Sequence, residues 1–240
     1  MLKRTFDALT SAVGLTVFAP LLIVIAVWVR LDSSGPVFYR GRRAGRNGKP
    51  FWVFKFRSMV TNADKIGGPS TSDDDPRVTR SGRFIRRFKL DELSQLINVL
   101  KGEMSLVGPR PEVVSKVEMF DEEERRTLVL RPGITDWASL WNSDEGALLE
   151  GAPDPDGAYE QVIRPTKRQL QLHYCENNNV WTDLKIILYT IVKIFHKNWT
   201  PRELEGYPSY AELRAEVEEL IAAAKLAQCQ QPTATSDLFV

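Results

Sequence analysis

The chain has 240 residues, 43% of them hydrophobic and 26% charged, with a formal net charge of +1. It is long enough to bury a core and fits one domain with appendages. Its two cysteines, Cys175 and Cys229, follow no metal or redox spacing, which argues against a disulfide framework and indicates a reducing compartment. Residues 1–110 hold 19 Lys and Arg against 9 Asp and Glu, and residues 111–240 hold 13 against 22. The N-terminal half is therefore the natural place for an anionic partner, whether phosphate substrate, anionic lipid or nucleic acid.

Residues 5–31 are the one candidate for a membrane segment. From Ala12 to Val29 there are 18 residues without a charge, about 27 Å as a straight helix, which just reaches across the hydrocarbon core. Cationic residues flank the segment on both sides, which favours two cytoplasmic ends. Pro20 can break the helix into two legs that enter and leave the same leaflet. These residues alone leave a re-entrant and a spanning helix equally open, and they disfavour a cleaved signal peptide because no small-residue cleavage site follows.

Residues 37–56 are predicted to form a β-hairpin. Two β-prone runs are joined through Asn47-Gly48, which is a turn signal. Lys55 and Arg57 are two residues apart, so both project from one face of the second strand while its aromatic residues take the other.

The stretch 83–112 holds an adjacent carboxylate pair between two cationic clusters. At 3.6 residues per turn its apolar residues fall on one helical stripe, which is predicted to pack inward. The stripe consists of Leu90, Leu93, Ile97 and Leu100. Asp91 and Glu92 lie off this stripe, in a first helical turn where the macrodipole favours negative charge.

Positive charge flanks this pair on both sides. The upstream residues are Arg80, Arg83, Arg86 and Arg87. Downstream, Arg110 stands between two prolines, which present its guanidinium from stiff backbone suited to a bidentate grip on phosphate. Dipole compensation by the acids and an ordinary turn at the prolines explain the same residues without any function, and the residues alone leave both interpretations open.

The remaining chain is predicted to be mostly helical after a polar loop at 62–80. Helices are expected over 112–130, twice between 160 and 199, and over 210–228, before a loose tail. In residues 180–199 the apolar side chains share a face, which is typical of an interfacial helix and equally of a core-facing one. That face consists of Trp181, Leu184, Ile187, Leu188, Ile191, Val192 and Phe195. The acidic helix at 210–228 is a candidate for docking on the basic half or for self-association, which leaves a homodimer open.

The sequence KLDELSQLINVLKGEMSLVGPRPE, preceded by DPRVTRSGRFIRR and followed by RPGIT, closely resembles the bacterial sugar transferases. These are polyprenyl-phosphate hexose-1-phosphate transferases of the monotopic phosphoglycosyl transferase superfamily, and the resemblance runs from about Lys3 to about Trp199. It implies a mainly helical α+β fold with a small β-hairpin, interfacial amphipathic helices and a globular cytoplasmic catalytic domain. The expected division is a re-entrant membrane helix hairpin broken at Pro20 (1–35), the transferase domain (36–200), and a C-terminal amphipathic helix with a flexible tail (201–240).

The resemblance also implies a reaction at the cytoplasmic leaflet of the bacterial inner membrane. A sugar-1-phosphate moves from a UDP-sugar to a polyprenyl phosphate such as undecaprenyl phosphate, and UMP is released. Asp91 is then the expected nucleophile, forming a phosphosugar-aspartate, while Glu92 assists with protons. Both carboxylates are also the expected ligands of Mg²⁺. The expected contacts to phosphate or lipid headgroup are Lys55, Arg57, Arg86 and Arg110.

Two features depart from the family pattern. After RPGIT many members carry Gly-Trp and a short Gln/Asn segment, whereas this chain has Asp136-Trp137 and continues to Gly146 with an unrelated sequence. This leaves the identity of the transferred sugar undetermined. The sequence also does not identify the polymer that follows. Ser94 stands where a proline is common, which leaves the carboxylate pair intact.

Three other functions fit parts of the pattern. A membrane-anchored scaffold that binds anionic lipid without catalysis would use the same basic half. A Mg²⁺ phosphohydrolase would differ only in letting water accept the phosphosugar. A nucleic-acid binder is disfavoured, because the arginines cluster around acids and turns and no recognisable binding motif is present.

Overall fold

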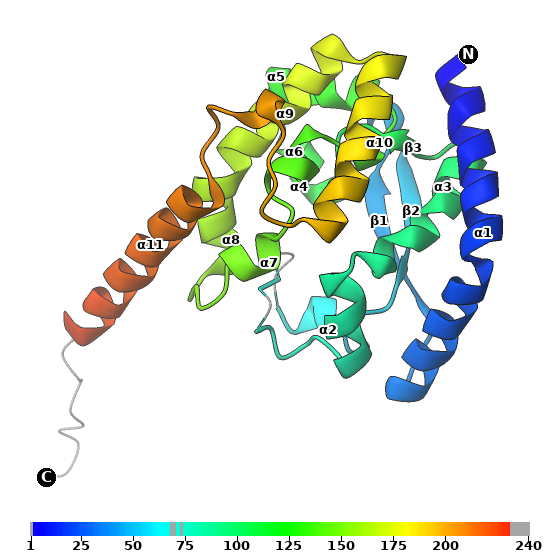
Figure 1. The fold of residues 1–240 in the computed structure, drawn as a ribbon. Helices are drawn as coiled ribbons and strands as arrows, with labels where there is room; N and C mark the ends of the chain where they lie inside the picture. The colour runs from blue at the N-terminus through cyan, green and yellow to red at the C-terminus, as the bar shows by residue number, and fades with distance from the viewer. Residues whose placement is uncertain (1, 68–70, 73, 231–240) are drawn as a thin grey trace, which may run out of the picture.

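The computed structural model describes residues 2–67, 71–72 and 74–230, the side chains of residues 64 and 227–230 excepted. It is a mainly helical α+β body, as predicted, and it contains a second small sheet besides the predicted hairpin (Figure 1). The predicted tail beyond residue 230 lies outside the described residues. The α-helices are α1 (Leu2–Asp32), α2 (Arg80–Arg87), α3 (Leu96–Lys101), α4 (Val114–Glu118), α5 (Glu122–Arg125), α6 (Trp137–Trp141), α7 (Glu145–Leu148), α8 (Pro155–Ala158), α9 (Arg164–Asn177), α10 (Val180–Phe195) and α11 (Tyr210–Gln230). The strands are β1 (Phe38–Ala44), β2 (Pro50–Phe56), β3 (Ser105–Val107) and β4 (Gly133–Thr135). The short helical turns are η1 (Arg46–Gly48), η2 (Ala63–Lys65), η3 (Leu90–Gln95), η4 (Arg126–Val129), η5 (Tyr159–Ile163) and η6 (Arg202–Leu204).

The predicted hairpin is present as the antiparallel pair β1–β2. Asn47 in its turn has a φ of 56°, a left-handed conformation that Asn tolerates better than most residues. Along β2, Phe51 and Val53 are buried, and Lys55 continues the same face because it is the next residue of that parity. The strand thus delivers a lysine side chain to the interior side of the hairpin.

The second sheet is the parallel pair β3–β4, with Ser105 opposite Gly133. It continues into a very close contact of two glycines, because a Cβ added to Gly133 would lie 2.1 Å from the Gly108 nitrogen. Only residues without a side chain permit this approach. The contact fixes the start of the Pro-Arg-Pro loop, which follows directly on Gly108.

The prediction of an inward-facing leucine stripe is wrong. The segment is split into η3 and α3, Leu100 is exposed, and the other three stripe residues are only half-buried. The polar side faces inward because it serves the backbone of β2: Ser94 Oγ donates to the Phe54 carbonyl at 3.1 Å, and Asn98 bonds the Phe54 N–H and the Trp52 carbonyl, both at 2.8 Å. Hydrogen-bonding demand of the strand therefore outweighs the apolar periodicity.

The prediction of a single helix over 112–130 is also wrong. The chain forms α4, α5 and η4 in succession. Asp121 restarts the helix in the middle of this range, since its side chain accepts from the Glu124 N–H while the Glu124 side chain bonds the Asp121 N–H. Such a reciprocal cap marks a helix N-terminus and breaks a longer run.

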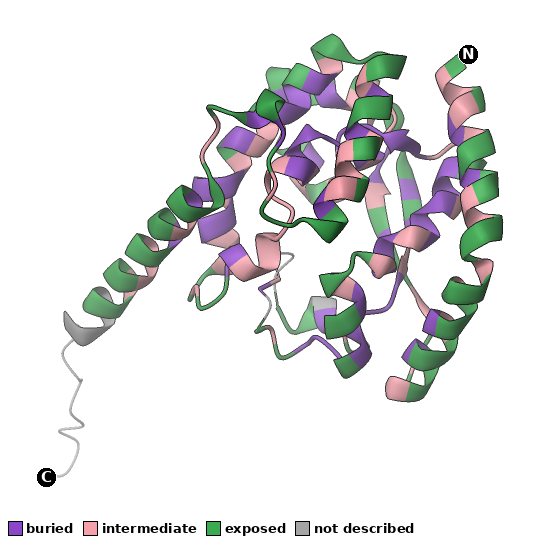
Figure 2. Cartoon of the chain, viewed as in Figure 1, coloured by how far each residue is buried: buried purple, intermediate pink, exposed green. Residues whose placement is uncertain are grey.

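Helix α1 contains Pro20 and is drawn as one helix that changes direction partway along (Figure 1). Among the described residues it is the one helix long and apolar enough to cross a membrane, and most of its surface is exposed (Figure 2). Its exposed apolar residues include Leu9, Val13, Val17, Ile23, Val24 and Val27. The re-entrant path through a bilayer stays a prediction.

The N-terminal part of α1 is hydrogen-bonded to the globular body. Asp7 is buried, and its two carboxylate oxygens accept from Ser105 Oγ at 2.8 Å and from the Leu106 N–H at 3.2 Å. Lys3 forms an ion pair with Asp183 of α10. A mostly apolar helix is therefore hydrogen-bonded to strand β3 through Asp7.

The C-terminal end of α1 is held by a second set of polar contacts. Arg57, just after β2, donates to the carbonyls of Val29 at 3.2 Å and Ser33 at 2.7 Å. Asp32 accepts from the Ser81 N–H at 2.9 Å, at the start of α2. Both ends of the membrane candidate are thus attached to the same body.

Helix α10 turns its predicted apolar face outward. The side chains of Asp183, Ile186 and Lys193 are buried, whereas most of the apolar face is exposed. Its exposed members are Trp181, Leu184, Leu188, Ile191 and Phe195. The structure therefore decides against the core-facing alternative for this helix.

Helix α11 packs against the acidic half of the chain. Leu213 and Val217 are buried with Leu148 and Ile163, and the far end of the helix extends away from the body (Figure 1). The predicted docking on the basic half is therefore wrong, since α11 packs on residues 148–163; self-association stays a prediction.

Candidate active site

The carboxylate pair is placed by a reversal of the chain between α2 and η3. Lys89 adopts a left-handed conformation with φ 55°, so η3 begins with Asp91 and Glu92 turned toward the hairpin. Lys55 Nζ lies 2.9 Å from Asp91 Oδ2 and 3.3 Å from Glu92 Oε1. Arg110 grips the other side of Glu92 with both terminal nitrogens, Nη1 at 3.2 Å from Oε2. Three segments far apart in the sequence thus meet at two adjacent acids.

Both carboxylates are buried, with Asp91 2% and Glu92 8% exposed. Burial by itself would raise the pKa of Glu92, but the charges of Arg110 and Lys55 outweigh it and hold that pKa well below its usual value. Glu92 is therefore ionised at neutral pH. Each of the two acids has a cation in direct contact.

The two cations remain accessible although the acids are not. The side chains of Lys55 and Arg110 are 26% and 37% exposed. An anionic ligand can therefore reach both cations, while the Asp91 oxygens lie directly behind Lys55. This is an arrangement in which a carboxylate nucleophile can meet a phosphate whose charge is neutralised.

A metal ion would have only these two carboxylates as ligands. No cluster of three or more His, Cys, Asp or Glu placed to hold a metal occurs among the described residues. Mg²⁺ commonly takes one or two carboxylates and completes its shell with water and substrate phosphates. The pair Asp91 and Glu92 fits that mode and does not form an all-protein cage.

Arg57 and Arg86 are not brought into contact with the pair. Arg57 uses its guanidinium on the carbonyls at the end of α1, as described above. Arg86 is half-buried in α2; the pKa of Asp75 is lowered mainly by hydrogen bonds from Arg77, and the Arg86 charge adds to this. Of the four predicted binding cations, Lys55 and Arg110 are therefore the two that the fold assembles at the acids.

The region that departs from the family pattern begins with a structural aspartate. Asp136 is fully buried and caps α6, accepting from the N–H and the hydroxyl of Ser139, both at 2.7 Å. Trp137 is buried in the main core. Ser94 occupies the position of the expected proline and bonds β2 with its hydroxyl.

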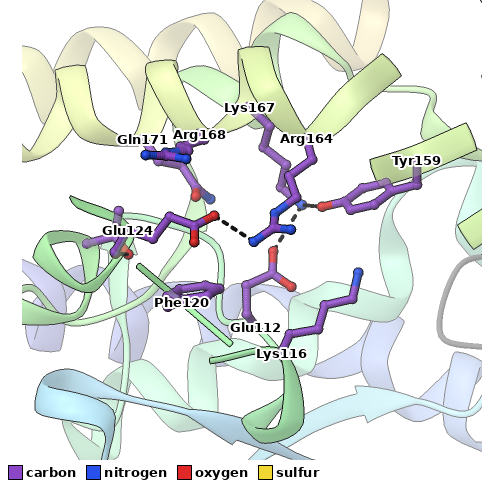
Figure 3. Close-up of a pocket in the computed structure, with 10 residues that line it drawn as sticks. Glu112, Lys116, Phe120, Glu124, Tyr159, Arg164, Lys167, Arg168 and Gln171 are labelled. Carbon is purple, nitrogen blue, oxygen red and sulfur yellow. Dashed lines mark hydrogen bonds and ion pairs between the residues drawn. The ribbon is translucent and has the colours of Figure 1, made fainter. Parts of the chain in front are cut away.

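A pocket that sequence reasoning missed adjoins the Pro-Arg-Pro loop (Figure 3). It is lined by Glu112, Lys116, Phe120, Glu124, Thr127, Tyr159, Arg164, Lys167, Arg168 and Gln171. Glu112 pairs with Lys167 at 3.2 Å, and Lys167 donates to the Tyr159 hydroxyl at 2.6 Å. A second hollow, lined by Arg110 among others, shares Glu112 and Phe120 with this pocket. The only signal in the sequence is that Glu112 directly follows Pro-Arg-Pro.

Comparison with known proteins gives a consistent result. A family model described as Bacterial sugar transferase matches residues 1–197. The chain is 43% identical over 205 residues to an undecaprenyl-phosphate glucose phosphotransferase of Komagataeibacter xylinus, a match that covers 82% of this chain and 36% of that protein. It is 39% identical over 201 residues to a UDP-glucose:undecaprenyl-phosphate glucose-1-phosphate transferase of Escherichia coli, covering 81% and 40%.

A third relative, the exopolysaccharide production protein ExoY of Sinorhizobium fredii, is 35% identical over 204 residues, covering 79% of this chain and 83% of ExoY. The chain therefore spans less than half the length of the first two relatives and most of the third. With the family model matched over most of its length, the chain belongs to the bacterial sugar transferase family.

Proposed function

We propose that this chain transfers a sugar-1-phosphate from a UDP-sugar to undecaprenyl phosphate with release of UMP, as the first membrane step in assembling a bacterial glycoconjugate or exopolysaccharide. The activities by which the first two relatives are named support this reaction, and the name of ExoY supports a role in exopolysaccharide production. The observation that carries it is the buried Asp91–Glu92 pair held between Lys55 and Arg110. A nucleophilic acid with two accessible cations is what phosphoryl transfer between anions requires.

In the first half-reaction an Asp91 oxygen attacks the sugar-bearing phosphorus of the UDP-sugar. A bond from that oxygen to phosphorus forms, the pyrophosphate P–O bond breaks, and UMP leaves with its electron pair. Lys55 and Arg110 move from the carboxylates toward the phosphate oxygens as charge redistributes on them. Glu92, kept ionised by its two cations, holds those cations in place until the substrate arrives.

In the second half-reaction an oxygen of undecaprenyl phosphate attacks the same phosphorus and displaces Asp91. The products are the free carboxylate and a lipid diphosphate sugar. Asp91 and Glu92 would hold Mg²⁺ together with the substrate phosphates, and the ion would supply charge neutralisation at the pyrophosphate.

A re-entrant α1 is the membrane arrangement that these contacts support. Lys3 and Asp7 near one end and Val29 and Asp32 near the other are bonded to the same globular body. A helix that crossed the bilayer would have to place its two ends about 30 Å apart in opposite compartments. The proposal therefore seats α1 in the cytoplasmic leaflet of the inner membrane, with the exposed apolar face of α10 at the interface.

The test is to incubate purified protein in detergent with a panel of UDP-sugars and Mg²⁺ but no lipid, and to measure UMP release and protein mass. We expect a stoichiometric burst of UMP and a phosphosugar adduct on Asp91 with one or a few of the sugars. Asp91→Asn should abolish both, whereas Asp74→Asn, in an exposed loop, should leave both intact. UMP release that survives Asp91→Asn without an adduct would contradict the assignment of the nucleophile.

The same assay separates the other candidate functions. Continuous UMP release without lipid would indicate a phosphohydrolase, because water would then be turning over the intermediate. Anionic vesicle binding that weakens with salt, with no UMP release from any sugar and no effect of Asp91→Asn, would indicate a lipid-binding scaffold.

A further inference from the structure

The Pro-Arg-Pro loop is fixed at both of its ends by backbone hydrogen bonds. The Gly133 N–H donates to the Pro109 carbonyl at 2.9 Å, and the Ala44 N–H donates to the Glu112 carbonyl at 2.9 Å. The first bond comes from β4 and the second from the hairpin that carries Lys55. Arg110 lies between these two anchors, so its direction depends on both of them.

The Glu112 side chain adds a third attachment, toward α9. Its carboxylate lies 3.2 Å from Lys167 Nζ, and Lys167 donates to the Tyr159 hydroxyl at 2.6 Å (Figure 3). Lys116 covers the Tyr159 ring, with its Nζ 4.4 Å from the ring centroid. The side chain of Lys167 is only 13% exposed, so this ion pair is sheltered from water. Sheltered pairs hold geometry more firmly than surface pairs do.

Arg110 has a long side chain whose only described ion-pair partner is Glu92. During the proposed reaction that partner must be exchanged for phosphate oxygens, so the guanidinium keeps its place only if its backbone is held. Glu112 is the attachment point two residues away, and its side chain is secured by Lys167.

We infer that Lys167 is a positioning residue for the transfer reaction, acting through Glu112 to hold the Pro-Arg-Pro loop and hence Arg110. This inference rests on the proposed function, because it assigns a task to Arg110 in phosphoryl transfer. Tyr159 orients the Lys167 ammonium, and η5 and α9, in a region outside the recognisable motifs, become part of the catalytic support.

The charges around Glu112 make this attachment sensitive to pH. Burial opposes ionisation of Glu112, yet its pKa is lowered, chiefly by Lys167 and then by Lys116 and Arg110. The groups that face it are Lys167 from α9, Lys116 from α4, Arg110 from its own loop and Tyr159 from η5. Without Lys167, less positive charge offsets the effect of burial on Glu112. The pKa of Glu112 therefore rises, and the carboxylate becomes protonated at a higher pH.

The experiment measures the single-turnover rate of adduct formation at saturating UDP-sugar, using full-length protein in detergent. We expect Lys167→Met to slow adduct formation at least tenfold, and Lys167→Arg to recover most of the rate because it keeps the charge. The control Lys197→Met removes a surface lysine–carboxylate pair, with Asp144 at 2.9 Å, and should leave the rate unchanged.

Two further variants keep the inference testable if Lys167→Met folds poorly. Glu112→Gln should slow the reaction to a similar extent, and the double variant Glu112→Gln with Lys167→Met should be no slower than either single one, because the two side chains act as a unit. Protonation of Glu112 should appear as a fall in rate on the acid side of the pH–rate profile. This fall should occur at higher pH in Lys167→Met and should be absent from Glu112→Gln.

The outcomes separate this inference from the proposed function. If wild-type protein forms no adduct with any UDP-sugar, the proposed function fails and the inference fails with it. If wild type forms the adduct but Lys167→Met and the double variant form it at the wild-type rate, only the inference is overturned. The same holds if the double variant recovers the full rate, since that pattern reports relief of an unpaired charge and not positioning.

Discussion

Among the residues that the structure describes, Lys55 is the one cation that contacts both acids, so its removal gives the sharpest test of the site. Lys55→Met keeps the length and apolar stem of the side chain but leaves Asp91 without a cation and Glu92 with Arg110 alone. Breaking a buried ion pair by removing one partner costs about 3–5 kcal/mol. Because the Lys55 side chain is 26% exposed, we expect the lower end, about 3 kcal/mol at neutral pH.

The cost should depend on pH in a defined direction. Without Lys55, one of the two charges that lower the pKa of Glu92 is gone, so Glu92 takes up a proton at a higher pH than in the wild type, which relieves part of the cost. The destabilisation should therefore be about 3 kcal/mol at pH 7.5 and clearly smaller at pH 5. Urea unfolding in detergent at both values, followed by tryptophan fluorescence, measures the difference.

The matched control is Lys49→Met, which removes an exposed lysine from the hairpin turn. It should change the free energy of unfolding by less than about 0.5 kcal/mol at either pH. An effect of Lys55→Met no larger than that of Lys49→Met, or one equal at pH 7.5 and pH 5, would refute the electrostatic reasoning about the site.

Three further predictions follow from the contacts described. Gly133→Ala should cost about 3 kcal/mol or more and lower the thermal midpoint sharply, because its Cβ would collide with the Gly108 backbone; a well-folded variant would contradict the close approach. Arg57→Met should lower stability by about 2 kcal/mol through the lost carbonyl contacts at the end of α1, with Arg57→Lys recovering part of it in thermal denaturation. Since the pKa of Glu92 is lowered in the folded state, the contribution of this carboxylate to the wild-type free energy of unfolding should be fully present above about pH 4.3 and be lost as the pH drops further. Arg110→Gln should flatten that acid slope in urea titrations, and an unchanged slope would speak against the pairing.

The sequence was most informative where a residue pattern is typical of a single local structure. Asn47-Gly48 predicted the hairpin turn, and the left-handed φ of Asn47 confirms it. The two helices predicted between 160 and 199 and the one predicted over 210–228 are present as α9, α10 and α11. Lys55 was predicted through resemblance, and Arg110 also from its two flanking prolines, as contacts to phosphate. Their ion pairs with the acids were not predicted, since no local pattern links residues 55, 92 and 110.

The failures share a physical cause. Apolar periodicity predicted that Leu100 would be buried, but the open backbone of β2 required hydrogen-bonding partners, and Asn98 supplied them by turning the polar side inward. Arg57 lies away from the acids for a related reason: its charge was visible in the sequence, but the carbonyls at the end of α1 to which it donates were not. Its contact to phosphate or lipid headgroup stays a prediction. A single sequence shows which interactions a residue can form, but it does not show which partner the fold brings into contact with it.

The grip of Asp7 on strand β3 has a consequence for engineering. Helix α1 cannot be exchanged for any apolar helix of the same length, because one of its own side chains completes the hydrogen bonding of Ser105 and Leu106, a few residues before the loop that carries Arg110. A chimera in which residues 2–32 are replaced by an unrelated hydrophobic helix would leave the Ser105 hydroxyl and the Leu106 N–H without this partner. Truncation to make a water-soluble version carries the same defect unless an acidic group is supplied again at that spot.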